Sequence, residues 1–489
     1  MQVYDIIVVG GGAAGMLASA TAAENGARVL LLERNAGPGK KLRITGKGRC
    51  NLTNNCSITE AIENIPNGGK FLHSAFALHG PGDTMQLFEK LGVPLKTERG
   101  GRVFPQSDKA SDIVAALGAY MDKAGVERAR GRAVALQTEA GRFVGNKPER
   151  GLELMPGNAP ERGLELMRGR LPENMPKHTL ERKPGNTPER AQENTPGHTP
   201  EREQEHILPR VTGVTYDGGE ARCGAVILAT GGLSYPATGS TGDGYEMAAA
   251  LGHKVTPLRG SLVPLDAESD ICGAMQGLTL KNVKLSAYGA GPTPIFEDIG
   301  EVLFTHFGLS GPLTLSASAH MRDFDKTKYH VIIDFKPGLD EKKLDLRILR
   351  DFEKYSNRDF ANSLDDLLSK SCIPVVVRKS GIPPHTKVHS IIREQRLRLV
   401  ELLKSFRIDV IGPRPVEEAI ITSGGVDLRE INPKTMESKL VGGLFFAGEI
   451  IDADAYTGGF NLQIAWSTAF AAANAAAAAV IGGRTQPLR

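Results

Sequence analysis

A run of small residues near the N-terminus, Gly-Gly-Gly-Ala-Ala-Gly at positions 10–15, constrains the fold of this chain more than any other feature. It follows an apolar stretch at 5–9, predicted as a buried strand, and it opens a helical stretch at 13–25. A second apolar stretch at 28–33 completes a strand–helix–strand unit. Glycines in such a turn let the backbone approach a pyrophosphate, which sits at the start of the helix. The unit therefore predicts dinucleotide binding.

Glu33 supplies the second half of this signature. It stands 18 residues after Gly15, at the end of the second strand. A carboxylate at this position accepts hydrogen bonds from the ribose hydroxyls of an adenosine. Because an acid rather than a base disfavours a 2′-phosphate, FAD or NAD is expected rather than NADP.

Three later segments favour FAD over NAD. Apolar strands at 226–229 and 444–447 are each followed by glycine, and the second also by Glu449. In flavoproteins the first such strand follows a β-hairpin crossover, and the acid after the second lies against the ribityl chain. Residues 457–462, Thr-Gly-Gly-Phe-Asn-Leu, open the last helix. The N–H groups of that helix can stabilise the charge that develops on a flavin during reduction.

Composition disfavours several other classes of protein. Lys and Arg total 59 against 56 for Asp and Glu, and a net charge of +3 predicts no nucleic-acid partner. The five cysteines show neither disulfide-framework nor zinc-ligand spacing, so no metal is expected. The N-terminus lacks the basic region of a signal peptide, and the alanine-rich tail at 468–481 is shorter than a membrane span. A cytoplasmic protein without membrane contact is expected.

Residues 147–205 differ from the rest of the chain. They contain no Val, Ile, Phe, Tyr, Trp or Cys, and Pro-Glu-Arg recurs four times. Such a segment cannot bury enough apolar surface to offset the entropy of ordering, so disorder is expected. Alternating segments at 132–143 and 207–216 flank it, which places the insertion in a surface loop of a hairpin.

The remaining patterns divide the chain into domains. Short alternating strands with Gly and Pro turns run from 261 to about 335, and a helical period follows at 340–406. The expected boundaries are 1–146, 206–260 and 417–489 for the FAD-binding domain, 147–205 for the insertion, and 261–416 for an insert domain that is β-rich and then helical.

The chain resembles the bacterial YhiN/BaiN-like FAD-dependent oxidoreductases, also called the aminoacetone-oxidase-type family, over all of its length except 147–205. The resemblance implies an α/β fold, in which a three-layer Rossmann-like FAD-binding domain is interrupted by a β-barrel-plus-helical insert domain. The segment 238–244 is also similar to fumarate-reductase-type flavoproteins. The matching family motifs lie at 40–51, 103–110, 304–312, 435–439, 448–449 and 458–459.

These motifs, together with the glycine turn, Glu33 and the later segments described above, indicate the residues expected to hold FAD. Among them Lys40, Lys41 and Arg49 are expected to neutralise the pyrophosphate or to support the reduced flavin. The full set is Gly10, Gly12, Ala13, Ala14, Gly15, Glu33, Arg34, Lys40, Lys41, Arg49, Cys50, Asn51, Val134, Thr230, Gly231, Gly448, Glu449, Gly459, Asn461 and Leu462.

The sequence assigns no catalytic group, and Cys50 and His306 are only weak candidates. A thiol next to Arg49 could have a lowered pKa, although a packed residue lining the flavin loop is the favoured interpretation of Cys50. His306 is either a general acid or a hydrogen-bonded structural residue. Tyr235 and Tyr456 lie near the FAD motifs and could face the substrate, although core packing is the favoured interpretation of both.

The function that follows is an FAD-dependent oxidoreductase. It would transfer hydride through a non-covalent flavin to or from a small organic substrate, with reduction of an activated C=C bond as one option. No second dinucleotide fingerprint occurs, so NAD(P)H could dock only transiently. The alternatives are a flavin-dependent nucleic-acid-modifying protein, disfavoured by the near-neutral charge, and a flavin-binding regulator without turnover.

Overall fold

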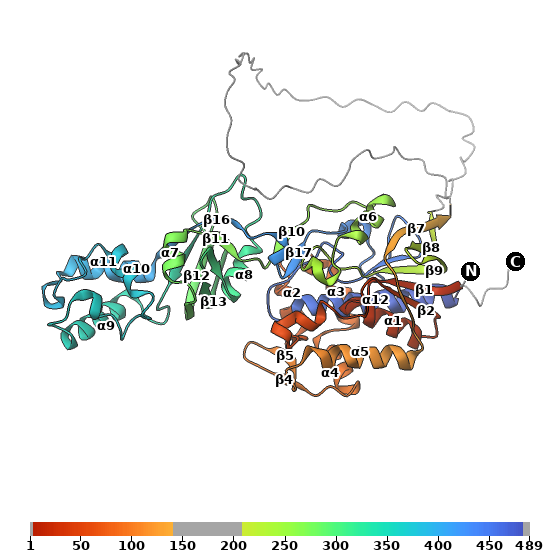
Figure 1. Cartoon of the computed structure of the whole chain (residues 1–489), viewed down its shortest axis with the longest axis horizontal. Coiled ribbons are helices and arrows are strands. Elements are labelled where there is room, and N and C mark those ends of the chain that lie inside the picture. The colour runs from red at the N-terminus through yellow and green to blue at the C-terminus, as the bar shows by residue number, and fades with distance from the viewer. Residues whose placement is uncertain (1–2, 140–207, 483–489) are drawn as a thin grey trace, which may run out of the picture. The chain divides into compact units, whose positions relative to one another are not determined.

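The computed structural model describes residues 3–139 and 208–482 (Figure 1). The insertion expected at 147–205 therefore lies outside the described residues. In the described part, the N-terminal strand–helix–strand unit belongs to a seven-stranded sheet of order β6-β2-β1-β9-β8-β7, with β18 also paired to β9. The strands are β1 (Val3–Val9), β2 (Val29–Glu33), β6 (Glu127–Arg130), β7 (Ala133–Glu139), β8 (Arg210–Tyr216), β9 (Gly219–Leu228) and β18 (Leu444–Phe446).

Strand β1 occupies the centre of this sheet. It pairs in parallel with β2 on one side and with β9 on the other. The carboxyl half of β9 also pairs in parallel with β18, from Val226 to Leu228. The carboxyl ends of β1, β9 and β18 therefore meet at one edge, which is where open α/β sheets bind their ligands.

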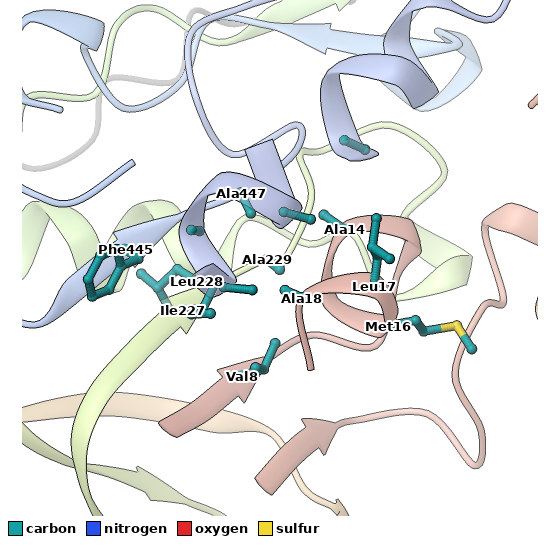
Figure 2. Packing of buried hydrophobic residues seen from close by; sticks show 14 of the residues in the cluster. Val8, Ala14, Met16, Leu17, Ala18, Ile227, Leu228, Ala229, Phe445 and Ala447 are labelled. Atoms are coloured by element: carbon teal, nitrogen blue, oxygen red, sulfur yellow. The ribbon is translucent and has the colours of Figure 1, made fainter. Parts of the chain in front are cut away.

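Helices rich in small residues pack on the parallel strands. Helix α1 (Ala13–Glu24) is buried from Ala14 to Ala23, and it packs against α5 (Ala110–Ala124) and α12 (Phe460–Gly482). Figure 2 shows Ala14 and Ala18 of α1 on the side facing Ala229 and Ala447, beyond the ends of β9 and β18. Small side chains at this contact let the helix approach the sheet closely.

Helix α12 is a core helix. Trp466 is fully buried, and its indole N–H donates to the carbonyl of Leu52 at 3.0 Å. By length and composition this helix could cross a membrane, but 61% of its most apolar window is buried inside the protein. The helix begins at Phe460 and spans 23 residues, so residues 457–462 open the last helix as expected, and the alanine-rich stretch at 468–481 forms its later part. Close packing of its alanines is confirmed, with Ala469 and Ala472 fully buried.

The hairpin expected around the insertion is present. Strands β7 and β8 pair antiparallel, with Glu139 opposite Arg210, and β8 continues into an antiparallel pair with β9. The two chain ends that border the undescribed segment are thus joined in one sheet.

A closed six-stranded barrel follows in the chain, as the fold class predicted. Its order is β11-β14-β13-β12-β15-β16, and helices α9, α10 and α11 are inserted between β15 and β16 (teal to blue in Figure 1). Barrel and helices share one apolar core that includes Phe304, Leu344 and Phe406. The elements are β11 (Leu265–Ala267), α7 (Ser269–Ala274), β12 (Thr279–Tyr288), β13 (Phe296–Phe304), β14 (Gly308–Ser310), α8 (Pro312–Ser318), β15 (Tyr329–Asp334), α9 (Glu341–Lys354), α10 (Ile373–Ser380), α11 (Arg393–Lys404) and β16 (Phe406–Pro413).

Several short elements were not expected from the sequence. A three-stranded sheet of order β3-β5-β4 and a two-stranded sheet of β10 and β17 lie outside the main sheet. These elements and the remaining helices are β3 (Thr53–Asn54), α2 (Ile58–Glu63), α3 (Gly69–Leu78), α4 (Pro81–Lys90), β4 (Leu95–Thr97), β5 (Arg102–Pro105), α6 (Asp243–Ala250), β10 (Arg259–Ser261) and β17 (Ile421–Ser423).

A pair of glycine variants tests the contact between α1 and the sheet. A Cβ on Gly15 would lie 1.8 Å from the carbonyl oxygen of Gly10, whereas a Cβ on Gly118 in α5 would meet nothing within 4 Å. We expect Gly15→Ala to lower the free energy of unfolding by about 1–3 kcal/mol, as overpacking does. Gly118→Ala should be neutral or stabilising by up to about 1 kcal/mol, because alanine is the better helix former. Thermal unfolding measures both, and equal midpoints would contradict the close approach.

Candidate functional site

A cavity of about 340 Å³ opens where the parallel strands end, within the range of roughly 300–1,000 Å³ typical of small-molecule sites. Most of the residues expected to hold FAD line it, although they come from distant parts of the chain. Those that do are Gly10, Gly12, Ala13, Ala14, Glu33, Arg34, Lys40, Lys41, Asn51, Thr230, Gly231, Gly448, Glu449, Gly459, Asn461 and Leu462.

The start of α1 faces this cavity without a side-chain cap. Gly12 is the N-cap residue and makes no side-chain hydrogen bond to the helix. A Cβ added to Gly12 would meet nothing within 4 Å, so the space beside it is open. Free N–H groups at a helix start attract an anion, and their partial positive charge favours phosphate. This geometry can hold a pyrophosphate.

Glu33 is held at the edge of the cavity by main-chain donors. Its Oε2 accepts from the N–H of Gly11 at 2.7 Å, and its Oε1 accepts from both the backbone and side-chain nitrogens of Asn35 at 2.7 Å. These bonds orient the carboxylate at the end of β2, next to the glycine turn. The sequence did not single out Asn35, which also lines the cavity.

A charged cluster lies on the same side of the cavity. Asp243, at the start of α6, is 2.8 Å from Arg132 and 3.2 Å from Arg34. Burial works in the opposite direction, but hydrogen bonds from Arg132 and Thr241 hold the pKa of Asp243 below its ordinary value. The expected set contained Arg34 but missed the other residues. The similarity of 238–244 to other flavoproteins was the signal that could have identified Thr241 and Asp243.

Glu449 has protein partners on both carboxylate oxygens. Its Oε2 is 2.7 Å from Lys41 Nζ, and its Oε1 accepts from the N–H of Thr422 at 2.8 Å and from Ser234 Oγ at 3.0 Å. Lys41 also donates to Ser234 Oγ at 2.7 Å. The pair is mostly shielded from solvent, so it is screened less than a surface ion pair. Lys40, by contrast, donates to the carbonyl of Ala237 at 2.6 Å.

The turn before α12 is tight and close to β3. Gly459 has a φ of +100°, and a Cβ there would lie 2.4 Å from the carbonyl oxygen of Thr53. Asn461 fixes the preceding loop, because its side chain accepts from the N–H of Ala455 and donates to the same residue's carbonyl, both at 2.8 Å. The start of α12 is thereby aimed at the cavity, where Gly459, Asn461 and Leu462 line the wall.

Two polar atoms in the cavity wall have no protein partner. The hydroxyl of Thr230 and the amide oxygen of Asn51 are buried without a hydrogen bond. Burying such groups unpaired is costly, so a bound polar ligand would satisfy them. Together with the open space at Gly12, these atoms make the cavity suitable for a polar dinucleotide such as FAD.

Arg49, which was expected to hold FAD, does not line the cavity. Its guanidinium forms ion pairs with Glu98 and with Asp108, and it lies 4.2 Å from the ring centroid of Phe104. The two carboxylates, which follow β4 and β5, hold it there, a contact that local sequence could not indicate.

The lowered pKa considered for Cys50 was wrong. The side chain is fully buried, and burial raises the pKa of the thiol to about 12, despite an opposing hydrogen bond with Thr45. Cys50 also lies outside the cavity wall. Cys50 is a packed residue, as the favoured interpretation predicted, but it does not line the cavity.

His306, Val134 and Gly15 also lie outside the cavity wall. His306 is exposed, and its ring meets that of Phe307 edge-on at 5.1 Å. Val134 is exposed on β7, while Gly15 forms the contact between α1 and Gly10. Among the described residues, no group of three or more His, Cys, Asp or Glu is placed to hold a metal ion.

The structure adds an apolar wall to the site and brings one of the two tyrosines near the FAD motifs, Tyr456, to the same cavity. Leu262, Ile420 and Ile421 line the cavity, and Tyr456 lines it with its half-buried ring. Tyr456 packs against the small apolar cluster of Leu262 and Ile421, as the favoured interpretation predicted, and it also lines the cavity, as the alternative predicted. Tyr235 stays outside the lining and is half buried.

Thiol alkylation tests the burial of Cys50. In the folded protein at pH 8 we expect iodoacetamide to leave Cys50 unmodified, because the thiolate is the reactive form and burial disfavours it. Cys56 is only half buried, with a pKa raised to about 11 by burial, and should react first. Peptide mass spectrometry measures both sites. Modification of native Cys50 as fast as Cys56 would contradict the structure.

Comparison with known proteins places this site in a family. The chain matches the family described as HI0933-like protein Rossmann domain over residues 4–149 and 199–475. It is 27% identical over 481 residues to the ribosomal RNA dihydrouridine synthase of Escherichia coli (strain K12), across 97% of this chain and 98% of that protein. It is 26% identical over 478 residues to the 3-dehydro-bile acid delta(4,6)-reductase of Clostridium scindens, across 96% of this chain and 98% of that protein.

Among solved structures, this chain is similar to a 3-ketosteroid delta1-dehydrogenase from Sterolibacterium denitrificans, with a TM-score of 0.48 and 13% sequence identity. The similarity covers 98% of this chain and 100% of that chain. The resemblance drawn from the motifs is confirmed by the family match and by the curated relatives. The chain belongs to the HI0933-like family of FAD-binding Rossmann flavoproteins, which includes the YhiN/BaiN-like oxidoreductases.

Proposed function

We propose that this protein is an FAD-dependent reductase of a carbon–carbon double bond conjugated to a carbonyl group. The observation that carries the proposal is that the dinucleotide cradle and the apolar wall meet in one and the same cavity. A flavin bound in the cradle supplies the hydride chemistry, and the protein supplies orientation and electrostatics.

The residues that would hold FAD follow from the geometry of the cavity. The N–H groups at the start of α1 would bind the pyrophosphate, and Glu33 would accept from the ribose of the adenosine. Glu449, kept in place by Lys41 and Thr422, would face the ribityl chain. The unpaired hydroxyl of Thr230 would gain a partner from the cofactor. The start of α12 would stabilise negative charge on the reduced ring.

The names of two relatives support this type of reaction. One is a delta(4,6)-reductase of a 3-dehydro-bile acid, and the other is a synthase of dihydrouridine in ribosomal RNA. Both names describe hydrogen added to a carbon–carbon double bond. The apolar wall of Leu262, Ile420 and Ile421 favours a hydrophobic small molecule here, because apolar side chains gain little from a charged substrate.

A uridine in RNA is the second candidate substrate, supported by the name of the Escherichia coli relative. The balance of 59 basic and 56 acidic residues disfavours it, since proteins that bind RNA neutralise phosphates with a basic surface.

Reoxidation of the reduced flavin tests the proposed reaction. The holoprotein is photoreduced without oxygen and mixed with 4-androstene-3,17-dione, a conjugated enone. We expect the oxidised flavin absorbance to return and the enone to become its saturated ketone. The saturated analogue androstane-3,17-dione, which lacks the double bond, is the matched control and should leave the flavin reduced. Reoxidation by unmodified ribosomal RNA transcripts but by no enone would favour the second candidate, and reoxidation by neither would contradict both.

A substitution at the helix start tests the cofactor assignment. Gly12→Ala puts a methyl group into the open space beside the first N–H groups of α1. We expect it to weaken FAD binding by tenfold or more, about 1.4 kcal/mol per factor of ten. Gly37→Ala is the control, because Gly37 also has open space around it but lies outside the cavity wall. FAD titration into the apoprotein gives both dissociation constants. Equal dissociation constants for Gly12→Ala and wild type would contradict the placement of the pyrophosphate at the start of α1.

We propose NADH or NADPH as the electron donor. Its docking would be transient, because no second dinucleotide fingerprint follows residue 15. Anaerobic mixing with each nucleotide should bleach the flavin if the donor docks over it. If dithionite alone bleaches the flavin, either the donor is a different reductant or the protein is a flavin-binding regulator without turnover.

A further inference from the structure

Tyr456 brings a phenol to the cavity just before α12 begins. It stands three residues before Gly459, and both line the same wall. Its backbone N–H donates to the carbonyl of Asn64 at 3.0 Å, and Asn461 Nδ2 lies 3.4 Å from its carbonyl oxygen. The main chain of Tyr456 is thus held from two sides, which limits where the ring can lie.

A histidine from a distant part of the chain holds the phenol oxygen. Nε2 of His320, which follows α8, is 2.6 Å from the hydroxyl of Tyr456. The rings of His320 and Tyr456 lie 5.6 Å apart, and Phe296 contacts both, with centroids at 5.6 and 6.1 Å. Packing among three rings therefore supports the hydrogen bond.

The protonation states of His320 and Tyr456 determine which of the two can donate the hydrogen bond between them. Burial and the nearby Arg322 lower the pKa of His320, so the imidazole is neutral at pH 7. Burial raises the pKa of Tyr456, so the phenol keeps its proton. In the tautomer that carries its proton on Nε2, His320 donates to the phenol oxygen. The O–H of Tyr456 is then free to donate to another acceptor.

Aliphatic side chains pack on part of the Tyr456 ring, while Arg322, Asp298 and Asp454 lie near enough to act on its phenol electrostatically. Leu262 and Ile421 pack in the same small cluster as Tyr456, and both also line the cavity. A hydroxyl donor beside aliphatic side chains selects a ligand that is hydrophobic except for one acceptor. The carbonyl oxygen of a conjugated enone has this chemistry.

We propose that Tyr456 is a catalytic residue that protonates the carbonyl oxygen of an apolar conjugated enone, and that His320 is its positioning residue. This inference rests on the proposed function. Tyr456 would give its proton to the C=O π pair as the C=C electron pair shifts toward the carbonyl carbon, while a bound reduced flavin would supply the hydride that adds to the β-carbon. The product is an enol, which tautomerises in water to the saturated ketone. The phenolate of Tyr456 is stabilised by the N–H of His320 and regains a proton from water.

Binding of a stable phenolate tests the donor without any turnover. The 4-cyanophenolate anion resembles a flat enolate, and it can be titrated into the oxidised holoprotein while the flavin absorbance is followed. We expect Tyr456→Phe to raise its dissociation constant about tenfold to a hundredfold, because a hydrogen bond to a charged oxygen is lost. Tyr288→Phe is the matched control, since Tyr288 stacks on His330 at 5.1 Å in the barrel and lies outside the cavity wall. Unchanged binding in Tyr456→Phe would overturn the inference.

Enone reduction then tests the roles of the two residues. Tyr456→Phe should slow flavin reoxidation by about 10²-fold or more, the usual contribution of a general acid. His320→Ala should lower kcat more than it changes KM, and His320→Gln, whose amide N–H can still donate, should recover part of the loss. Equal kcat in His320→Ala and wild type would remove its positioning role. If the wild-type flavin is not reoxidised by the enone, the proposed function fails, while weaker phenolate binding in Tyr456→Phe would still place Tyr456 in the ligand site.

Discussion

The close approach of backbone to backbone at the start of α1 is the contact on which the rest of the site depends. A Cβ on Gly15 would meet the carbonyl of Gly10 at 1.8 Å, and a Cβ on Gly10 would meet that of Ala229 at 2.6 Å. Only glycine tolerates such spacing, and Gly10 also adopts a φ of +100°. The helix start can therefore lie directly over the strand ends, with its N–H groups turned to the cavity. Any larger residue would lift the helix and remove the anion site.

Polar interactions then join segments that lie far apart in the sequence. Glu449 follows β18, and its partners Lys41, Ser234 and Thr422 come from three other segments of the chain. Since a partly buried carboxylate is costly without donors, these segments are held in one arrangement by its need for hydrogen bonds. Thr422 belongs to β17, which pairs with β10 just before the barrel begins. The same network thus ties the edge of the main sheet to the strands that lead to and from the barrel.

The distribution of reactive groups indicates where the redox chemistry resides. Cys50, Cys223, Cys272 and Cys372 are buried, and burial raises the pKa of each thiol to about 12. Such thiols are poor nucleophiles and poor redox partners at neutral pH. The cavity instead offers unpaired hydrogen-bonding atoms at Thr230 and Asn51 and a phenol at Tyr456. A bound flavin is therefore the expected carrier of electrons, with the protein providing donors and orientation.

Local sequence patterns were sufficient to predict the elements whose residues are close together in the sequence. The strand–helix–strand unit, the glycine turn and Glu33 are contiguous, so their spacing alone predicted their geometry, and the strands at 226–229 and 444–447 were recognised by their apolar runs. What sequence could not decide was the direction of side chains whose partners are distant. Arg49 turns to Glu98 and Asp108, and Tyr456 meets His320 across 136 positions. Long-range electrostatics and packing, which exist only after the chain has folded, selected those partners.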